Sequence, residues 1–149
     1  MNRKIYLSER TMTKMHELTK AYPDVENGGI IFGRMNTRWI KIYDVSDAGP
    51  RARRSRYGVV FDNTYLLEYT SRKEAEDHFF VGTWHSHPSG CSTYPSSTDK
   101  ETMVLLSKNF EICYYPVFCI TKFEDGLFSL NFYELNEKQR IATREYILF

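Results

Sequence analysis

The sequence has little of several features that mark whole classes of protein. It has three cysteines in 149 residues, an odd number without regular spacing, which argues against a disulfide framework and for a reducing cytoplasm. Its net charge of +1 gives no overall attraction to nucleic acid or to a membrane surface. No apolar run approaches the roughly 20 residues of a membrane-spanning helix, and the apolar patch after residues 1–4 is too short for a signal peptide. We therefore expect a cytoplasmic protein that binds neither nucleic acid nor membrane.

The chain also lacks internal repeats and any segment that resembles a linker. Its length suits one domain with a single core. A hydrophobic fraction of 42% and a charged fraction of 26% are ordinary for a globular protein. The sequence therefore predicts one domain over residues 1–149.

Hydrophobic periodicity predicts both strands and helices. A first helix should begin after Ser8, because Met12, Met15, Leu18 and Tyr22 recur at helical spacing. Strands are expected over 4–7, 28–35, 37–45, 57–61, 79–84, 116–122 and 127–133, and further helices over 62–78 and 99–110. The tail 136–149 could form a final helix. This order predicts an α/β fold of the α+β type, with a mixed central sheet flanked by helices.

Helical phase and apolar context also predict the burial of single side chains. Leu66, Leu67 and Tyr69 should face inward from the second helix. His16 lies off the apolar stripe of the first helix and should be solvated. Cys113 and Cys119 lie in apolar runs and should be small buried core residues.

The segment most informative about function is 83–99. His85 and His87 end an apolar run that reads as a buried strand, and residues two apart in a strand project from the same face. A loop rich in proline, glycine and serine follows, and then Asp99 leads into a helix-like run. Two imidazoles and one carboxylate, without a fourth protein ligand, are the donor set of an open catalytic zinc site. We expect this site to hold one Zn²⁺ per chain.

Simpler interpretations of these residues exist. Ser96 followed by Asp99 is also an ordinary helix start, with Ser96 as N-cap and an acidic residue in the first turn. A histidine near the end of a strand is often a hydrogen-bonded structural residue. The combination of two histidines on one face and a carboxylate within reach of the loop favours the metal site.

A glutamate further upstream completes a known pattern. Glu26 precedes Gly28-Gly29 and an apolar strand, after which come His85-Ser86-His87-Pro88, a short loop and Ser96-Ser97-Thr98-Asp99. In this order the sequence resembles the JAMM/MPN+ (JAB) metalloproteases, which cleave isopeptide and peptide bonds at the ends of ubiquitin-like proteins. The resemblance spans most of the chain and no motif position is missing. It implies the MPN/JAB fold, which is similar to that of cytidine deaminases.

The resemblance implies a role for each motif residue. His85, His87 and Asp99 would hold the zinc ion and leave one position for water. Glu26, close by but not a ligand, would take a proton from that water and pass it to the departing amine. The Ser96 hydroxyl would donate a hydrogen bond to the oxyanion that forms during the reaction.

The segment around residues 49–56 is most similar to the compact prokaryotic branch of this family, which is found beside E1-like and E2-like proteins. This similarity implies a zinc-dependent isopeptidase or peptidase that removes or trims a ubiquitin-like modifier, in a bacterial pathway such as antiphage defence. Its partners would be the modifier or its conjugates, and E1- or E2-like proteins. Two alternatives stay open. A catalytically silent MPN scaffold usually lacks ligands that this chain has, and a RadC-like protein of genome maintenance usually carries a DNA-binding helical module that this sequence does not show.

Two neighbouring segments have no fixed role in the pattern. The segment 51–56 holds four arginines, and a solvated loop is the favoured interpretation for most of them, with an anchor for an acidic protein surface as the alternative. Asn27 and Ser86 are expected beside the site because of their adjacency to Glu26 and the histidines.

Cys91 lies four residues after His87, in the loop between the second and third expected ligands. Thiolate is a strong zinc ligand, and a nearby cation favours that form. An incidental loop residue is the favoured interpretation. The alternative is that Cys91 occupies the water position in a resting state, so that the loop must move before cleavage.

Overall fold

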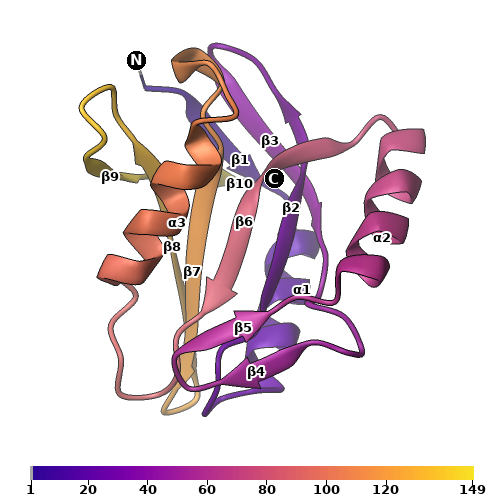
Figure 1. The fold of residues 1–149 in the computed structure, drawn as a ribbon, viewed down its shortest axis with the longest axis vertical. Helices are drawn as coiled ribbons and strands as arrows, with labels where there is room; N and C mark the ends of the chain where they lie inside the picture. The colour runs from indigo at the N-terminus through magenta and orange to yellow at the C-terminus, as the bar shows by residue number, and fades with distance from the viewer. Residues whose placement is uncertain (1) are drawn as a thin grey trace.

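A mixed sheet of eight strands forms the centre of the molecule (Figure 1). The computed structural model describes residues 2–149. In chain order its elements are β1 (Lys4–Leu7), α1 (Glu9–Lys20), β2 (Gly28–Met35), β3 (Trp39–Val45), β4 (Arg53–Ser55), β5 (Gly58–Val60), α2 (Asn63–Ala75), β6 (Phe79–Ser86), α3 (Ser97–Ser107), the short 3₁₀ helix η1 (Ile112–Tyr114), β7 (Val117–Glu124), β8 (Leu127–Leu135), β9 (Ile141–Arg144) and β10 (Tyr146–Leu148).

The strand order in the large sheet is β10-β1-β3-β2-β6-β7-β8-β9, and β4 pairs only with β5. β6 is therefore a central strand, antiparallel to β2 on one side and parallel to β7 on the other. A strand with hydrogen-bonded neighbours on both sides is held more firmly than an edge strand. This matters because the two histidines of interest lie at and just beyond the end of β6.

The sheet is curled, because β9 and β10 lie at opposite ends of its strand order and yet only Glu145 separates them in the chain. Side chains of strands near the two ends meet as a result. The rings of Phe132 on β8 and Tyr146 on β10 lie 5.4 Å apart between centroids. The tail of the chain therefore brings the two ends of the sheet together.

Alternation along the strands divides the core into two clusters. Cys119 on β7 belongs to the larger cluster, together with Met15 of α1. Phe118 and Ile120, which point to the opposite face of β7, pack with Met103 of α3. Helices thus cover both faces of the sheet, which confirms the predicted mixed α/β architecture (Figure 1). No helix within residues 2–149 is long and apolar enough to cross a membrane.

The tail is not a helix, contrary to the prediction. Its residues form β9, which pairs with β8, and β10, which pairs with β1. A helix there would leave the outer backbone groups of β1 and β8 without these partners, and buried backbone groups need hydrogen bonds. Pairing across the sheet therefore decided the conformation of this segment.

The other predicted strands and helices are confirmed, with ends shifted by a few residues, but three side chains differ from expectation. Cys113 is only partly buried, whereas Cys119 is buried as predicted. Leu67 is 70% exposed, because Leu66 and Tyr69, three residues apart, take the buried face of α2. His16 is not simply solvated: its ring stacks on that of Phe128, with centroids 4.8 Å apart.

A buried ion pair links the start of the chain to β8. Arg3 and Glu134 lie 2.7 Å apart, and their side chains are 4% and 5% exposed. Arg144 contacts the second carboxylate oxygen of Glu134 at 3.3 Å. Arg3 also donates to the carbonyl of Tyr115. The charges at this meeting point of β1, β8 and β9 are therefore removed from water and depend on one another.

Replacing Arg3 should destabilise the protein strongly. In Arg3→Met the buried Glu134 carboxylate keeps only Arg144, and breaking a buried pair costs about 3–5 kcal/mol of unfolding free energy. Chemical denaturation measures this loss. Arg34→Met is the matched control, since Arg34 and Asp77 are 3.9 Å apart with side chains 52% and 73% exposed, and an exposed pair contributes at most about 1 kcal/mol. If Arg3→Met lost no more unfolding free energy than Arg34→Met, the buried pair would not contribute to stability as expected.

Candidate metal centre

His85 lies at the end of β6 and His87 just beyond it, so that both imidazoles lie at one place. His85 lies opposite Gly28 on β2 and Ile120 on β7, so its backbone is fixed from both sides. The strands approach closely here: a Cβ on Gly28 would lie 2.5 Å from the carbonyl oxygen of Trp84. The Trp84 side chain points the other way, into the core. The Nε2 atoms of His85 and His87 are 3.2 Å apart, as expected for two residues on one face.

The first turn of α3 supplies the carboxylate. Ser96 is the N-cap of this helix, and its Oγ accepts from the Asp99 N–H at 3.0 Å while Asp99 Oδ2 accepts from the Ser96 N–H at 2.9 Å. The same Oδ2 lies 3.0 Å from His87 Nε2 and 3.2 Å from His85 Nε2. The helix-start and metal-site interpretations therefore describe the same residues, and both are compatible with the structure.

These three side chains fit a divalent metal ion. One atom from each, two imidazole nitrogens and one carboxylate oxygen, lies within 4.8 Å of the others. Ligand atoms around a tetrahedral zinc ion with bonds of about 2.0 Å are about 3.3 Å apart, close to the 3.0–3.2 Å seen between these atoms. His87 Nδ1 faces the carbonyl of Ser92, and donation to that oxygen leaves Nε2 free for a metal.

Without a metal, the cluster is an ion pair. Burial favours the neutral form of Asp99, but hydrogen bonds from His85 and His87 outweigh burial and hold the pKa of Asp99 well below its usual range. Burial also disfavours the imidazolium form of His87, yet its contacts with Asp99 and with the Ser92 carbonyl raise its pKa. A proton on His87 therefore competes with a metal ion for the same nitrogen.

Glu26 lies beside the cluster without joining it. It lines a hollow of about 370 Å³ together with His87 and Ser96, and a second hollow of about 260 Å³ together with His85 and Asp99. Burial raises the pKa of the Glu26 carboxyl, while the imidazoles of His85 and His87 oppose this shift. A carboxyl whose pKa is raised suits the transfer of protons better than an ordinary surface carboxylate does.

Comparison with known proteins identifies the family. The model of the prokaryotic homologues of the JAB domain matches residues 8–130, which include all of these side chains. The chain belongs to this family. The solution structure of the protein DSY2949 from Desulfitobacterium hafniense has the same fold, with a TM-score of 0.75, 18% sequence identity, and coverage of 97% of this chain and 92% of that one. No match was found among curated proteins.

The JAB domain of this chain holds one further residue at the site that the sequence did not single out. A solvated loop was the favoured interpretation for most of the arginines in 51–56, but Arg54 lies on β4 with its side chain 11% exposed. It donates to Asn27 Oδ1 at 2.9 Å and to Asp47 Oδ2 at 3.2 Å, and its guanidinium lies 4.1 Å from the centre of the Tyr22 ring. Strand alternation is the one signal that could have separated it from exposed Arg53.

The β4–β5 hairpin thereby positions the segment around Glu26. The Glu26 N–H donates to the carbonyl of Ser55 at 2.8 Å. Asn27, which is fully buried, exchanges hydrogen bonds with Ser86: its N–H donates to Ser86 Oγ at 2.9 Å, and its carbonyl accepts from the Ser86 N–H at 2.8 Å. Asn27 and Ser86 thus lie beside the site, as the adjacency of Glu26 and the histidines suggested.

The loop that carries Cys91 is held in place by hydrogen bonds. The Cys91 N–H donates to the Pro88 carbonyl at 3.1 Å, and the Cys91 carbonyl accepts from Lys122 Nζ at 2.9 Å. Cys91 lines the same hollow as Glu26 and His87, but it is not in the group of three ligand residues. Its role as a resting-state ligand stays a prediction, and the loop would have to shift for the thiol to join the cluster.

Substitution of Arg54 should loosen the β4–β5 hairpin. Arg54→Met leaves Asn27 Oδ1 and the Asp47 carboxylate without their donor, and we expect a loss of about 2 kcal/mol in unfolding free energy. Hydrogen exchange at the Glu26 amide should become faster, because its acceptor Ser55 lies on the same strand. Arg53→Met, at the adjacent exposed position, should change stability by less than about 0.5 kcal/mol. Similar denaturation curves for the two variants would contradict this role.

Cys91 has a direct spectroscopic test. If its thiolate is a resting-state ligand, zinc K-edge absorption should show a sulfur scatterer, Cys91→Ser should raise basal activity, and mild thiol oxidation should release the block. A first shell of nitrogen and oxygen alone, with unchanged activity in Cys91→Ser, would make Cys91 an incidental loop residue.

Proposed function

We propose that this protein is a zinc-dependent hydrolase that cleaves an amide bond at the end of a ubiquitin-like modifier. The observation that carries the proposal is the His85–His87–Asp99 cluster, with Glu26 in the adjoining hollows but outside the group of ligand atoms. This arrangement separates metal binding from proton transfer. A donor set of two imidazoles and a carboxylate suits zinc and leaves a position open.

Each side chain has a task in such a hydrolysis. Bound zinc would supply a Lewis acid that polarises the amide carbonyl and acidifies water. Glu26 would accept the proton of the attacking water and deliver it to the departing amine nitrogen. Ser96 Oγ accepts from the Asp99 N–H, so its own hydrogen is free to be donated to the oxyanion. Loss of one such donor costs about 3 kcal/mol of transition-state stabilisation.

The substrate follows from the family and from the shape of the site. The hollows beside Glu26 are small and lie at the surface between the β4–β5 hairpin and α3, where Tyr57 and Thr98 line both. They suit an extended tail of a protein better than a folded surface. Similarity to the prokaryotic branch supports a modifier of the ubiquitin type as substrate, with E1- and E2-like partners in a cytoplasmic pathway such as antiphage defence.

The purified protein should contain close to one zinc per chain. Elemental analysis measures this content, and a chelator should abolish cleavage of a ubiquitin-like fusion protein, with recovery on addition of zinc. A second stoichiometric zinc, or cleavage that persists in the chelator, would contradict the proposal. Zinc affinity should fall as the pH is lowered, because the raised pKa of His87 lets protons compete for Nε2 from above the ordinary histidine value of about 6.5 downwards.

Substitutions of Glu26 and Asp99 should impair different properties, turnover in the first case and zinc binding in the second. Glu26→Gln should bind zinc and fold normally yet lose most of its turnover, because the proton of the attacking water has no acceptor. Asp99→Ala should lose zinc affinity. Zinc titration and turnover, measured on both variants, separate the two roles. Equal loss of zinc in both variants would make Glu26 a ligand, and full turnover without Glu26 would favour a different base.

A further inference from the structure

A larger hollow lies between α1, the end of β3 and α2, and it shares no lining residue with the two hollows at the metal centre. Its volume is about 800 Å³, which is within the range of small-molecule sites. We call it the α1–α2 hollow. Its charged lining consists of four cationic side chains and two carboxylates: Arg10, Lys14, Arg72 and Lys73, with Asp44 and Glu76.

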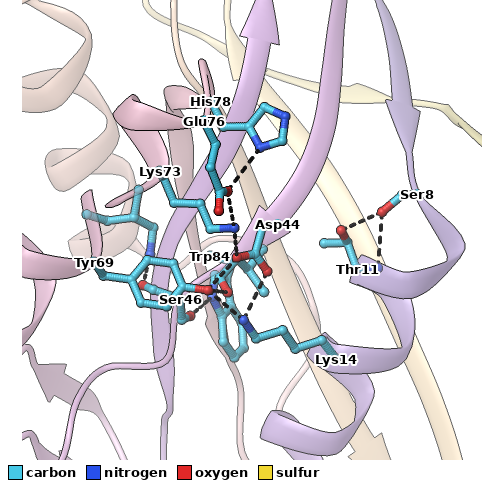
Figure 2. Close-up of polar contacts among 12 residues, drawn as sticks. Ser8, Thr11, Lys14, Asp44, Ser46, Tyr69, Lys73, Glu76, His78 and Trp84 are labelled. Atoms are coloured by element: carbon cyan, nitrogen blue, oxygen red, sulfur yellow. Dashed lines mark hydrogen bonds and ion pairs between the residues drawn. The ribbon is translucent and has the colours of Figure 1, made fainter. Parts of the chain in front are cut away.

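One carboxylate organises the wall of this hollow (Figure 2). Asp44 accepts from Lys14 Nζ at 2.9 Å, lies 2.9 Å from Lys73 Nζ, and accepts from the Tyr69 hydroxyl. Burial would raise the pKa of Asp44, but these three donors outweigh burial and lower it, so the carboxylate stays ionised. The contacts join α1, β3 and α2 and fix both ammonium groups at the wall of the hollow.

The positive charge that lines the hollow exceeds the negative charge of its carboxylates. Its four cations exceed its two carboxylates by two charges, although the whole chain has a net charge of only +1. Lys14, Arg72 and Lys73 all lie around the Tyr69 ring, at 5.2, 5.0 and 5.8 Å from its centroid. Within residues 2–149, neither Arg10 nor Arg72 lies within 4.0 Å of a carboxylate. Lys14 and Lys73 are paired with Asp44, and Lys73 also with Glu76, so the surplus positive charge belongs to the two arginines. Unneutralised cations around an open space form a site for an anion.

We propose that the α1–α2 hollow binds a small molecule that carries two or more phosphate groups. The guanidinium forks of Arg10 and Arg72 match phosphate oxygens two at a time, and the lysines add point charges. Tyr43 and His78 stack with centroids 4.7 Å apart and form an aromatic part of the wall, which suits the organic portion of such a ligand. This inference does not depend on the proposed peptidase activity.

Nuclear magnetic resonance with inorganic pyrophosphate tests the site. The ¹⁵N-labelled protein, as purified, is titrated at constant ionic strength, and its zinc content is measured before and after because pyrophosphate binds metal ions. Amide shifts should concentrate in 10–14, 43–44 and 69–78. Pyrophosphate should bind about tenfold tighter than inorganic phosphate, because two groups engage the cations at once. Shifts confined to the segments around His85 and Asp99 would indicate binding at the metal centre and overturn the proposal.

Variants at exposed positions sharpen the test. Arg10→Gln and Arg72→Gln should each weaken pyrophosphate binding about tenfold, the effect of losing one charge-assisted hydrogen bond. Glu76→Gln should tighten it about two- to fivefold by removing an opposing charge. The control Arg140→Gln, at an exposed position that does not line this hollow, should bind as the wild type does.

Three further outcomes would overturn the proposal. Pyrophosphate at millimolar concentration would cause no shifts at the α1–α2 hollow, or the Arg10 and Arg72 variants would bind it as tightly as Arg140→Gln does. In the third outcome, a polyglutamate peptide would bind the hollow more tightly than pyrophosphate does, which would assign it to an acidic protein partner.

Discussion

The carboxylate of Asp99 is the point on which the site depends, because one of its oxygens faces two imidazoles and a backbone N–H at the same time. The imidazoles come from the end of the central strand β6, and the N–H comes from the N-cap of α3. Asp99 can take this position only when the helix begins at Ser97 and the loop before it has the right length. The hydrogen bonds that cap α3 therefore also fix the position of the carboxylate in the cluster. The packing of α3 on β7 and β8 holds this helix start in place.

Glu26 is placed by a separate set of contacts. It precedes β2, and the β4–β5 hairpin holds it through Ser55, while Arg54 and Ser86 hold the next residue, Asn27. Ligands and proposed base thus reach the same hollows from different parts of the JAB domain. The two sets of contacts are linked, because Ser86, which holds Asn27, lies between the two histidines. The distance between Glu26 and the cluster therefore depends on β6 as well as on the hairpin, to which Arg54 anchors Asn27.

The sequence predicted those features that depend on local periodicity or on a motif. Period-two and helical patterns located the strands and α1, and the order of Glu26, His85, His87 and Asp99 indicated one site before any contact was known. It could not predict what depends on distant partners. The tail forms β9 and β10 because β8 and β1 need pairing, and Arg54 is buried because Asp47 and Asn27 lie beneath the hairpin. Neither partner can be identified from the segment itself.

Asn27 and Gly28 have a consequence for the chemical durability of the protein. In a flexible chain an asparagine followed by glycine deamidates readily, because the glycine nitrogen can reach the side-chain carbonyl. Here Asn27 is fully buried, its Nδ2 donates to the Leu18 carbonyl and to Asp47, and its Oδ1 accepts from Arg54. The folded state therefore protects Asn27 from deamidation, whereas the unfolded chain allows the reaction. An aspartate formed there would set a second negative charge against Asp47, so molecules that age while unfolded would return to the native state with a damaged site.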